Sequence, residues 1–150
     1  MTNRRDFIKK TSIGAAGIAV GVPAFSAKSY KRIMGANDRI NLGVIGLRSR
    51  GGDLMNSFSD MYNDGVNIKT LCDVDRQFFD KRINEAALKQ EGNKPNAVSD
   101  MRKVFDDQEI DAVIVATPNH WHALATIWAC QAGKHVYVEK PCSHNMAENQ

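Results

Sequence analysis

A glycine-containing turn that could bind an anion follows the first hydrophobic run of the chain. Residues 40–45 form that run, and Gly46 and Gly51 lie on either side of the turn. A buried strand, a glycine turn and a helix N-terminus, in this order, bring free backbone N–H groups and the positive end of the helix dipole to one point. The residues therefore predict a phosphate site, and a pyrophosphate is the usual occupant of such a site.

This turn departs from the dinucleotide fingerprint G-x-G-x-x-G at its middle glycine. Arg48 occupies that position, and Ser49 follows it. A glycine there lets the backbone approach the pyrophosphate, whereas the guanidinium of Arg48 could contact the phosphates directly. Because strand-to-helix turns in any doubly wound sheet favour glycine, the turn alone is compatible with a nucleotide site or with an ordinary turn.

Asp73 is a second candidate, because it directly follows the hydrophobic run at residues 66–72. A carboxylate at the tip of the second strand of a βαβ unit binds the hydroxyls of the adenosine ribose. The same carboxylate would repel the extra phosphate of NADP, so it favours NAD. The alternative is that Asp73 or Asp75 caps the next helix, and we expect Asp75 to be the cap.

Polar residues also follow two later hydrophobic runs, at 110–116 and 135–138. They are Thr117, Pro118, Asn119 and His122 after the first run, and Glu139 and Lys140 after the second. The carboxyl ends of parallel strands border the crevice in which open α/β sheets bind ligands. We therefore expect these residues to lie at the same edge of a sheet as Gly46 and Asp73.

Strand and helix patterns alternate after residue 38, which predicts an α/β fold with a doubly wound parallel sheet. Strands are predicted at 40–45, 66–72, 110–116 and 135–138, with at most a short strand at 96–98. A first helix is predicted after the glycine turn, because the apolar residues Leu54, Met55, Phe58 and Met61 recur at helical spacing. Further helices are predicted at 75–88, 99–105 and 122–132. Residues 39–150 are therefore interpreted as one dinucleotide-binding domain that is incomplete at its C-terminus, in a fragment of a longer protein.

The charge balance argues against a nucleic-acid-binding protein. The formal net charge is +3, but residues 1–26 hold four basic residues and one acidic residue, so the remaining residues have no net charge. No basic patch is left to bind a phosphate backbone.

The three cysteines are too widely spaced for a disulfide framework, and no metal site is predicted because the histidine and cysteine spacing matches no zinc template.

Residues 1–26 have the layout of a twin-arginine export signal. Arg4 and Arg5 precede a short, weakly hydrophobic stretch that is too short and too rich in glycine for a membrane span. We predict a signal at 1–26, a linker at 27–38, contact with the twin-arginine export machinery, and a periplasmic or otherwise exported protein. The alternative is an ordinary amphipathic N-terminal helix.

Several motifs together resemble the Gfo/Idh/MocA oxidoreductases, and with the leader they resemble the secreted branch of that family. The motifs are GVIG at 43–46, CDVD at 72–75, DAVIVATPNHWH at 111–122 and AGKHVYVEKP at 132–141. The resemblance implies an N-terminal Rossmann domain that binds NAD, with NADP less favoured. It also implies a C-terminal α/β substrate domain that is missing from this chain, that forms homo-oligomers and that contributes the general base.

The resemblance also implies roles for particular residues. The predicted cofactor-binding residues are Gly46, Arg48, Ser49, Gly51, Asp73, Thr117, Pro118, Asn119, His122, Glu139 and Lys140. Gly46 and Gly51 would flank the pyrophosphate, Asp73 would hold the adenosine ribose, and Glu139 would contact the nicotinamide ribose. Thr117, Asn119 and His122 would line the nicotinamide side of the site. Lys140 is the predicted catalytic residue, because it would reach between nicotinamide and substrate.

Three functions remain open from the sequence. The first is an NAD-dependent oxidoreductase that moves a hydride between the cofactor and a hydroxyl of a sugar or cyclitol. The second is a glycoside hydrolase that holds NAD tightly and oxidises the sugar transiently. The third is a sugar-binding protein that keeps the fold without catalysis. All three take a small sugar or sugar derivative as the ligand.

Overall fold

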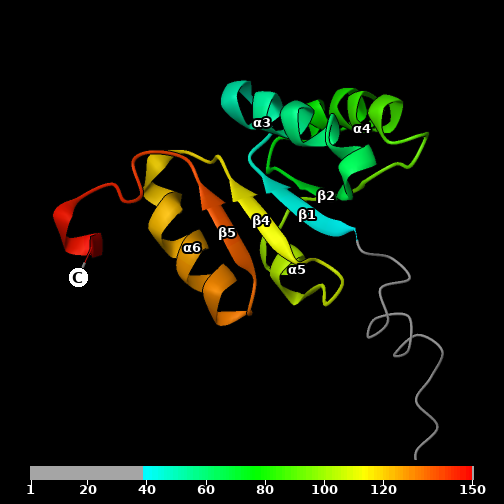
Figure 1. Ribbon diagram of the computed structural model, residues 1–150. Coiled ribbons are helices and arrows are strands. Elements are labelled where there is room, and N and C mark those ends of the chain that lie inside the picture. The colour runs from blue at the N-terminus through cyan, green and yellow to red at the C-terminus, as the bar shows by residue number, and fades with distance from the viewer. Residues whose placement is uncertain (1–38, 150) are drawn as a thin grey trace, which may run out of the picture. The chain divides into compact units, whose positions relative to one another are not determined.

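Five parallel strands form a single sheet in the computed structural model of the protein, which describes residues 39–149. The predicted export signal and linker lie outside the described residues. The strands are β1 (Ile40–Ile45), β2 (Val66–Cys72), β3 (Asn96–Val98), β4 (Ala112–Val115) and β5 (His135–Val138). Their spatial order is β3-β2-β1-β4-β5 (Figure 1), and every neighbouring pair is parallel. The predicted doubly wound parallel sheet is confirmed.

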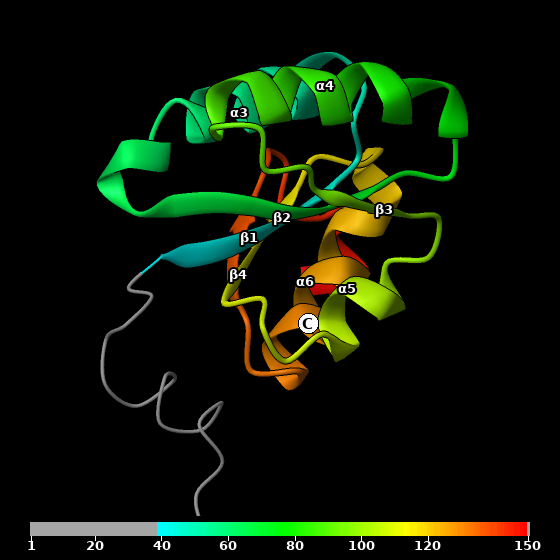
Figure 2. The same ribbon diagram turned by 90° about the vertical axis from the view of Figure 1, so that its right-hand side faces the viewer.

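Helices cover both faces of this sheet. They are α3 (Ser49–Ser59), α4 (Phe79–Lys89), α5 (Arg102–Asp106) and α6 (His122–Gln131). Figure 2 shows α3 and α4 on one face and α5 and α6 on the other. Short 3-10 turns occur at Tyr62–Asp64, Arg76–Phe78, Asn119–Trp121 and Met146–Asn149. Among the described residues, no helix is both long enough and apolar enough to span a membrane.

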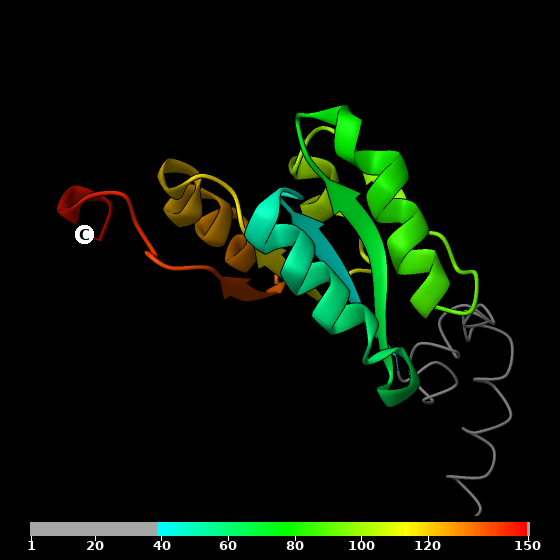
Figure 3. The same ribbon diagram turned by 90° about the horizontal axis from the view of Figure 1, so that it is seen from above.

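The core consists of two hydrophobic layers, one on each face of the sheet. On one face Leu42 and Val44 of β1 pack with Met55 of α3, and Figure 3 shows α3 and α4 side by side over this layer. On the other face Ile45 packs with Phe105 of α5 and with α6. Since β1 is buried from both sides, its nearly continuous apolar run is explained.

Several predicted elements differ from the structure at their ends. The helix predicted at 99–105 is α-helical only at Arg102–Asp106. The helix predicted at 75–88 begins with the 3-10 turn Arg76–Phe78 and becomes α-helical only at Phe79. The side chain of Asp75 accepts a hydrogen bond from the backbone N–H of Gln77, which explains the tight turn and confirms Asp75 as a cap. The strand predicted at 110–116 covers only Ala112–Val115.

The cysteines are all free thiols. Cys72 is buried in β2, where burial first and then the nearby carboxylates of Asp73 and Asp100 raise the pKa of its thiol to about 12. This side chain is therefore an inert part of the core. Cys130 lies in α6 and is exposed.

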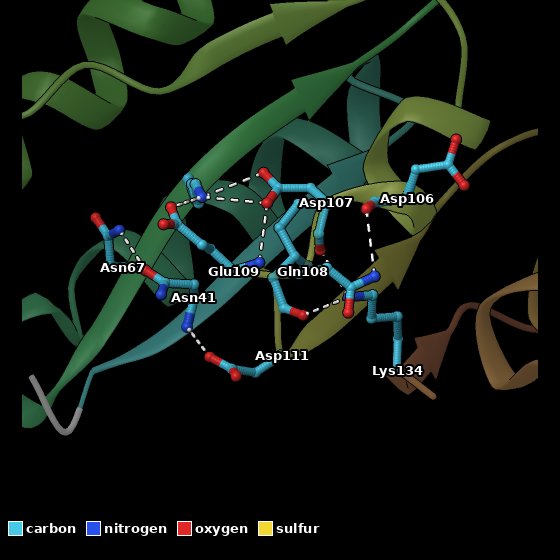
Figure 4. Close-up of polar contacts among 10 residues, drawn as sticks. Asn41, Asn67, Asp106, Asp107, Gln108, Glu109, Asp111 and Lys134 are labelled. Carbon is cyan, nitrogen blue, oxygen red and sulfur yellow. Dashed lines mark hydrogen bonds and ion pairs between the residues drawn. The ribbon is translucent and has the colours of Figure 1, made fainter. Parts of the chain in front are cut away.

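A polar network closes the amino edge of the sheet, opposite the glycine turn (Figure 4). Nζ of Lys134 donates to the backbone carbonyl oxygens of Asp107 and Ile110, at 2.6 and 2.9 Å. The backbone N–H of Asn41 donates to the carboxylate of Asp111 at 2.8 Å. These contacts fix the loop between α5 and β4, and thus the position at which β4 enters the sheet.

Candidate active site

The glycine turn between β1 and α3 is closely packed against its surroundings. Gly46 has a positive φ of 90°, and a Cβ atom on it would lie 2.6 Å from the carbonyl oxygen of Ala116. A Cβ atom on Gly51 would lie 1.9 Å from the carbonyl oxygen of Gly46. Both positions therefore require glycine, because α3 starts directly against the turn and the turn lies directly against the end of β4.

The N-terminus of α3 suits an anion. Arg48 is its N-cap residue, no side chain caps the helix, and its first turn contains no acidic residue. The backbone N–H groups and the helix dipole are thus left for a ligand of negative charge. Arg48 is exposed, and its guanidinium carbon lies 5.4 Å from the ring centre of Phe78. Ser49 has a φ of 34°, a conformation rarely adopted by serine, so the turn carries local strain.

Asp73 lies beside this turn. Its Oδ2 accepts a hydrogen bond from the backbone N–H of Leu47 at 2.7 Å, and its Oδ1 accepts one from the N–H of Asp75 at 2.9 Å. A carboxylate has about four acceptor positions, so two remain for the hydroxyls of a ribose. The structure thus brings together the predicted phosphate site and the predicted ribose site.

The end of β4 forms the other side of the turn. Thr117 follows it, and its Oγ1 atom is buried without a hydrogen-bond partner among the described residues. Pro118 and Asn119 are exposed, and Asn119 begins the 3-10 turn that leads into α6. A buried hydroxyl without a partner is a group that a polar ligand would satisfy. These features fit a dinucleotide that extends from Asp73 across the glycine turn to β4.

Glu139 and Lys140 follow β5 at the same edge of the sheet. Oε1 of Glu139 lies 2.8 Å from Nε of Arg50 and 3.3 Å from the hydroxyl oxygen of Tyr137. The hydrogen bond from Arg50 is the main reason that the pKa of Glu139 is lowered. Lys140 is exposed, and the peptide bond between it and Pro141 is cis.

Sequence reasoning missed Arg50 as a partner of this site. Its position beside Gly51, in a helix turn without acidic residues, is the signal that could have suggested a distant carboxylate partner.

The side chain of His122 lies in the interior of the protein. Only 1% of the residue is exposed, and its ring nitrogens contact two backbone carbonyl oxygens, those of Thr117 and Pro141. The family resemblance implies that this residue lines the nicotinamide side of the site, and that role stays a prediction. What the structure adds is a contact between the segments that follow β4 and β5.

Comparisons with known proteins agree with this geometry. The family model of the Gfo/Idh/MocA proteins, described as an oxidoreductase family with an NAD-binding Rossmann fold, matches residues 40–150. The chain belongs to this family. The predicted family and the predicted NAD-binding Rossmann domain are thereby confirmed.

Curated relatives of this Gfo/Idh/MocA chain include two glycosyl hydrolase family 109 proteins. The one from Shewanella pealeana is 33% identical over 97% of the chain and 35% of its own length. The one from Solibacter usitatus is 35% identical over 98% of the chain and 34% of its own length. The chain therefore spans about a third of the length of the curated relatives that it matches.

Solved structures with the same fold include two sugar or cyclitol dehydrogenases. A levoglucosan dehydrogenase in complex with NADH is 29% identical, has a TM-score of 0.60, and is matched over 73% of this chain and 30% of its own. A myo-inositol dehydrogenase from Lactobacillus casei is 20% identical, with a TM-score of 0.61 over 73% of this chain and 31% of its own. The second likeness shows the fold alone.

Proposed function

We propose that the protein to which this chain belongs is an NAD-dependent enzyme that oxidises or reduces a hydroxyl of a sugar or sugar derivative. The observation that carries the proposal is the position of the glycine turn between Asp73 and the end of β4. Leu47 of the turn donates to Asp73, and Gly46 lies against Ala116. A ribose site, a phosphate site and a polar site thus follow one another in the order that a dinucleotide needs.

Residues from three places in the fold would bind the cofactor. The carboxylate of Asp73 would accept from the adenosine ribose, and the uncapped N-terminus of α3 would hold the pyrophosphate. Glu139, oriented by Arg50, would accept from the nicotinamide ribose. NAD, when bound, supplies the nicotinamide ring that accepts or donates a hydride.

Lys140 is the residue of this chain that we assign to the substrate. Its ammonium is exposed, and among the described residues it makes no ion pair and no side-chain hydrogen bond. It is therefore available to donate a hydrogen bond to the substrate oxygen and to stabilise charge on that oxygen during reaction. A separate general base would take the proton of the substrate hydroxyl.

A glycoside hydrolase is the second candidate function, and the names of the relatives favour it. The two glycosyl hydrolase family 109 proteins are 33% and 35% identical over nearly the whole chain. In that reaction the sugar would be oxidised and reduced again at the same site, with no net change in NAD. The chain's residues would hold the cofactor in the same way for either function.

The test is the fate of the cofactor in the intact protein. We expect a dehydrogenase to produce NADH in excess of the enzyme concentration when NAD and a sugar substrate are supplied. A hydrolase would release free sugar from a glycoside without added NAD and without net NADH. Saturable sugar binding with neither product would contradict both enzymatic functions and leave a sugar-binding protein.

A further inference from the structure

The ring of His122 connects two backbone segments of the site. Nε2 lies 2.7 Å from the carbonyl oxygen of Thr117, which follows β4, and Nδ1 lies 2.7 Å from the carbonyl oxygen of Pro141, which follows β5. The residue is 1% exposed, so water does not compete for these contacts. A ring held at both nitrogens in the interior fixes the distance between the two segments.

This contact lies where the sheet no longer holds the segments together. The ladder between β4 and β5 ends at the pair Val115 and Val138. One more backbone hydrogen bond follows, from the N–H of Glu139 to the carbonyl oxygen of Val115 at 2.9 Å. After this bond, the contacts of the His122 ring are the next hydrogen-bonded link between the two segments among the described residues. Pro141, the residue it holds, directly follows Lys140.

The side chain of Lys140 depends on this link for its direction. Its ammonium has no partner among the described residues, so only its backbone determines where the side chain starts. That backbone is held on one side by Glu139, through the bonds to Val115 and Arg50, and on the other side by Pro141. Removing the bond to Pro141 would free the second side.

We propose that His122 is the positioning residue of Lys140: its Nδ1–H donates to the carbonyl oxygen of Pro141 and holds the backbone of Lys140 toward the substrate side of the crevice. The inference rests on the proposed function, because it assumes that Lys140 acts on the substrate. It also requires a hydrogen on Nδ1. Since both partners of the ring are carbonyl oxygens, only the imidazolium donates to both; the neutral ring with its hydrogen on Nδ1 donates to Pro141 alone, and the other neutral tautomer does not donate to Pro141.

Kinetics of the intact protein test this role. His122→Phe keeps the volume of the ring but has no donor, and we expect kcat to fall on the order of 10²-fold because a small displacement of a reacting group has that effect. NAD affinity and KM should change little. His122→Gln keeps an amide donor and should restore part of kcat. Equal kcat in all three proteins would overturn the proposal.

A matched control separates positioning from general stability. Ala129→Gly alters another buried residue of the same helix, seven residues after His122, and lowers helix stability without removing a hydrogen bond to the carbonyl oxygen of Pro141. We expect it to lower the unfolding temperature but to leave kcat of the folded protein unchanged. If it lowers kcat as much as His122→Phe does, the effect is one of stability and the positioning role is wrong.

Nitrogen-15 NMR of the histidine rings gives a readout that does not depend on activity. We expect the Nδ1 signal of His122 to show an attached hydrogen, in the parent and in Lys140→Met alike. A bare Nδ1 overturns the positioning role even if Lys140 is essential. Conversely, full turnover of Lys140→Met would refute the assigned role of Lys140, whatever the state of His122.

Discussion

Nε of Arg50 lies 2.8 Å from Oε1 of Glu139, so an ion pair connects the first turn of α3 to the residue that follows β5. The side chain of Arg50 is 59% exposed and that of Glu139 only 15%. The hydrogen bond between them raises the pKa of Arg50 and is the main cause of the lowered pKa of Glu139. The pair orients the carboxylate of Glu139, which directly precedes Lys140, toward the first turn of α3.

The first prediction concerns the pH dependence of NAD binding. Because the pKa of Glu139 is lowered in the folded protein, the ion pair is intact above the usual range for glutamate and is lost as the pH falls through the lowered value. Arg50→Gln should move the pKa of Glu139 upward. When NAD affinity is measured against pH, the affinity should therefore begin to fall at a higher pH in Arg50→Gln than in the parent as the solution becomes more acidic.

A variant at another ion pair provides the control for this titration. Lys89→Gln breaks the pair that α4 forms with Asp60, at the opposite end of α3. It should leave the pH profile unchanged. Identical profiles for the parent and Arg50→Gln would show that Glu139 does not contribute to NAD binding.

The second prediction concerns Gly51. A methyl group there would lie 1.9 Å from the carbonyl oxygen of Gly46, so Gly51→Ala must push α3 away from the turn. We expect a loss of about 1 to 3 kcal/mol in stability and a marked loss of NAD affinity, measured by urea unfolding and calorimetry. Gly133→Ala is the control, because its φ is 72° but the added atom would contact nothing. Gly133→Ala should lower stability without changing NAD affinity.

Much of the fold could be predicted from the sequence because parallel strands covered on both faces need apolar residues on both sides. The run at 40–45 is of this kind, and it became the central strand β1. Gly46 and Asp73 could be predicted for a related reason, since each directly follows a strand that the pattern identifies. The topology then brings them to the same edge of the sheet.

The pair of Arg50 with Glu139 could not be predicted in the same way. Both residues are charged, they are 89 positions apart, and no local pattern connects them. The direction of the His122 ring was equally inaccessible, because the sequence places the residue at the start of a helix without showing which side faces the interior. Both contacts depend on how α3 and α6 lie on the sheet.

The third prediction concerns the choice between NAD and NADP. Asp73→Asn keeps the size of the side chain but removes the charge that would repel a 2′-phosphate. We expect NAD affinity to fall about 10- to 100-fold, since a charge-assisted hydrogen bond is lost, and the preference over NADP to decrease. Calorimetry with both cofactors measures this. Tighter NADP binding by the parent would instead indicate that Arg76, three residues further on, controls the ribose site.

The fourth prediction concerns Lys140. Lys140→Met should lower turnover by about 10² to 10⁴ because a positioned polar group is lost, whereas NAD affinity should change little because the adenosine and phosphates are held elsewhere. Lys94→Met, at an exposed site in the loop before β3, is the control and should keep full turnover. A collapse of NAD binding in Lys140→Met would assign the lysine to the cofactor site instead.

The last prediction concerns Lys134 at the opposite edge of the sheet. The residue is 8% exposed, and its ammonium donates to the carbonyl oxygens of Asp107 and Ile110. Lys134→Met has a similar length but no donor. The carbonyl oxygen of Ile110 then loses its partner in a place that water reaches poorly, whereas that of Asp107 keeps a hydrogen bond from the backbone N–H of Ile110 at 3.2 Å. We expect a loss of about 1 to 3 kcal/mol, because an unsatisfied buried acceptor is costly.

Urea unfolding followed by circular dichroism measures this loss. Lys81→Met is the matched control: its side chain is 68% exposed, with a weak contact of 3.9 Å to Glu85, and it should change stability by less than about 0.5 kcal/mol. Because Lys134 lies at the amino edge, NAD affinity of the folded Lys134→Met protein should equal that of the parent. Unchanged stability together with weaker NAD binding would show that a substitution at this edge changes the affinity of the cofactor site.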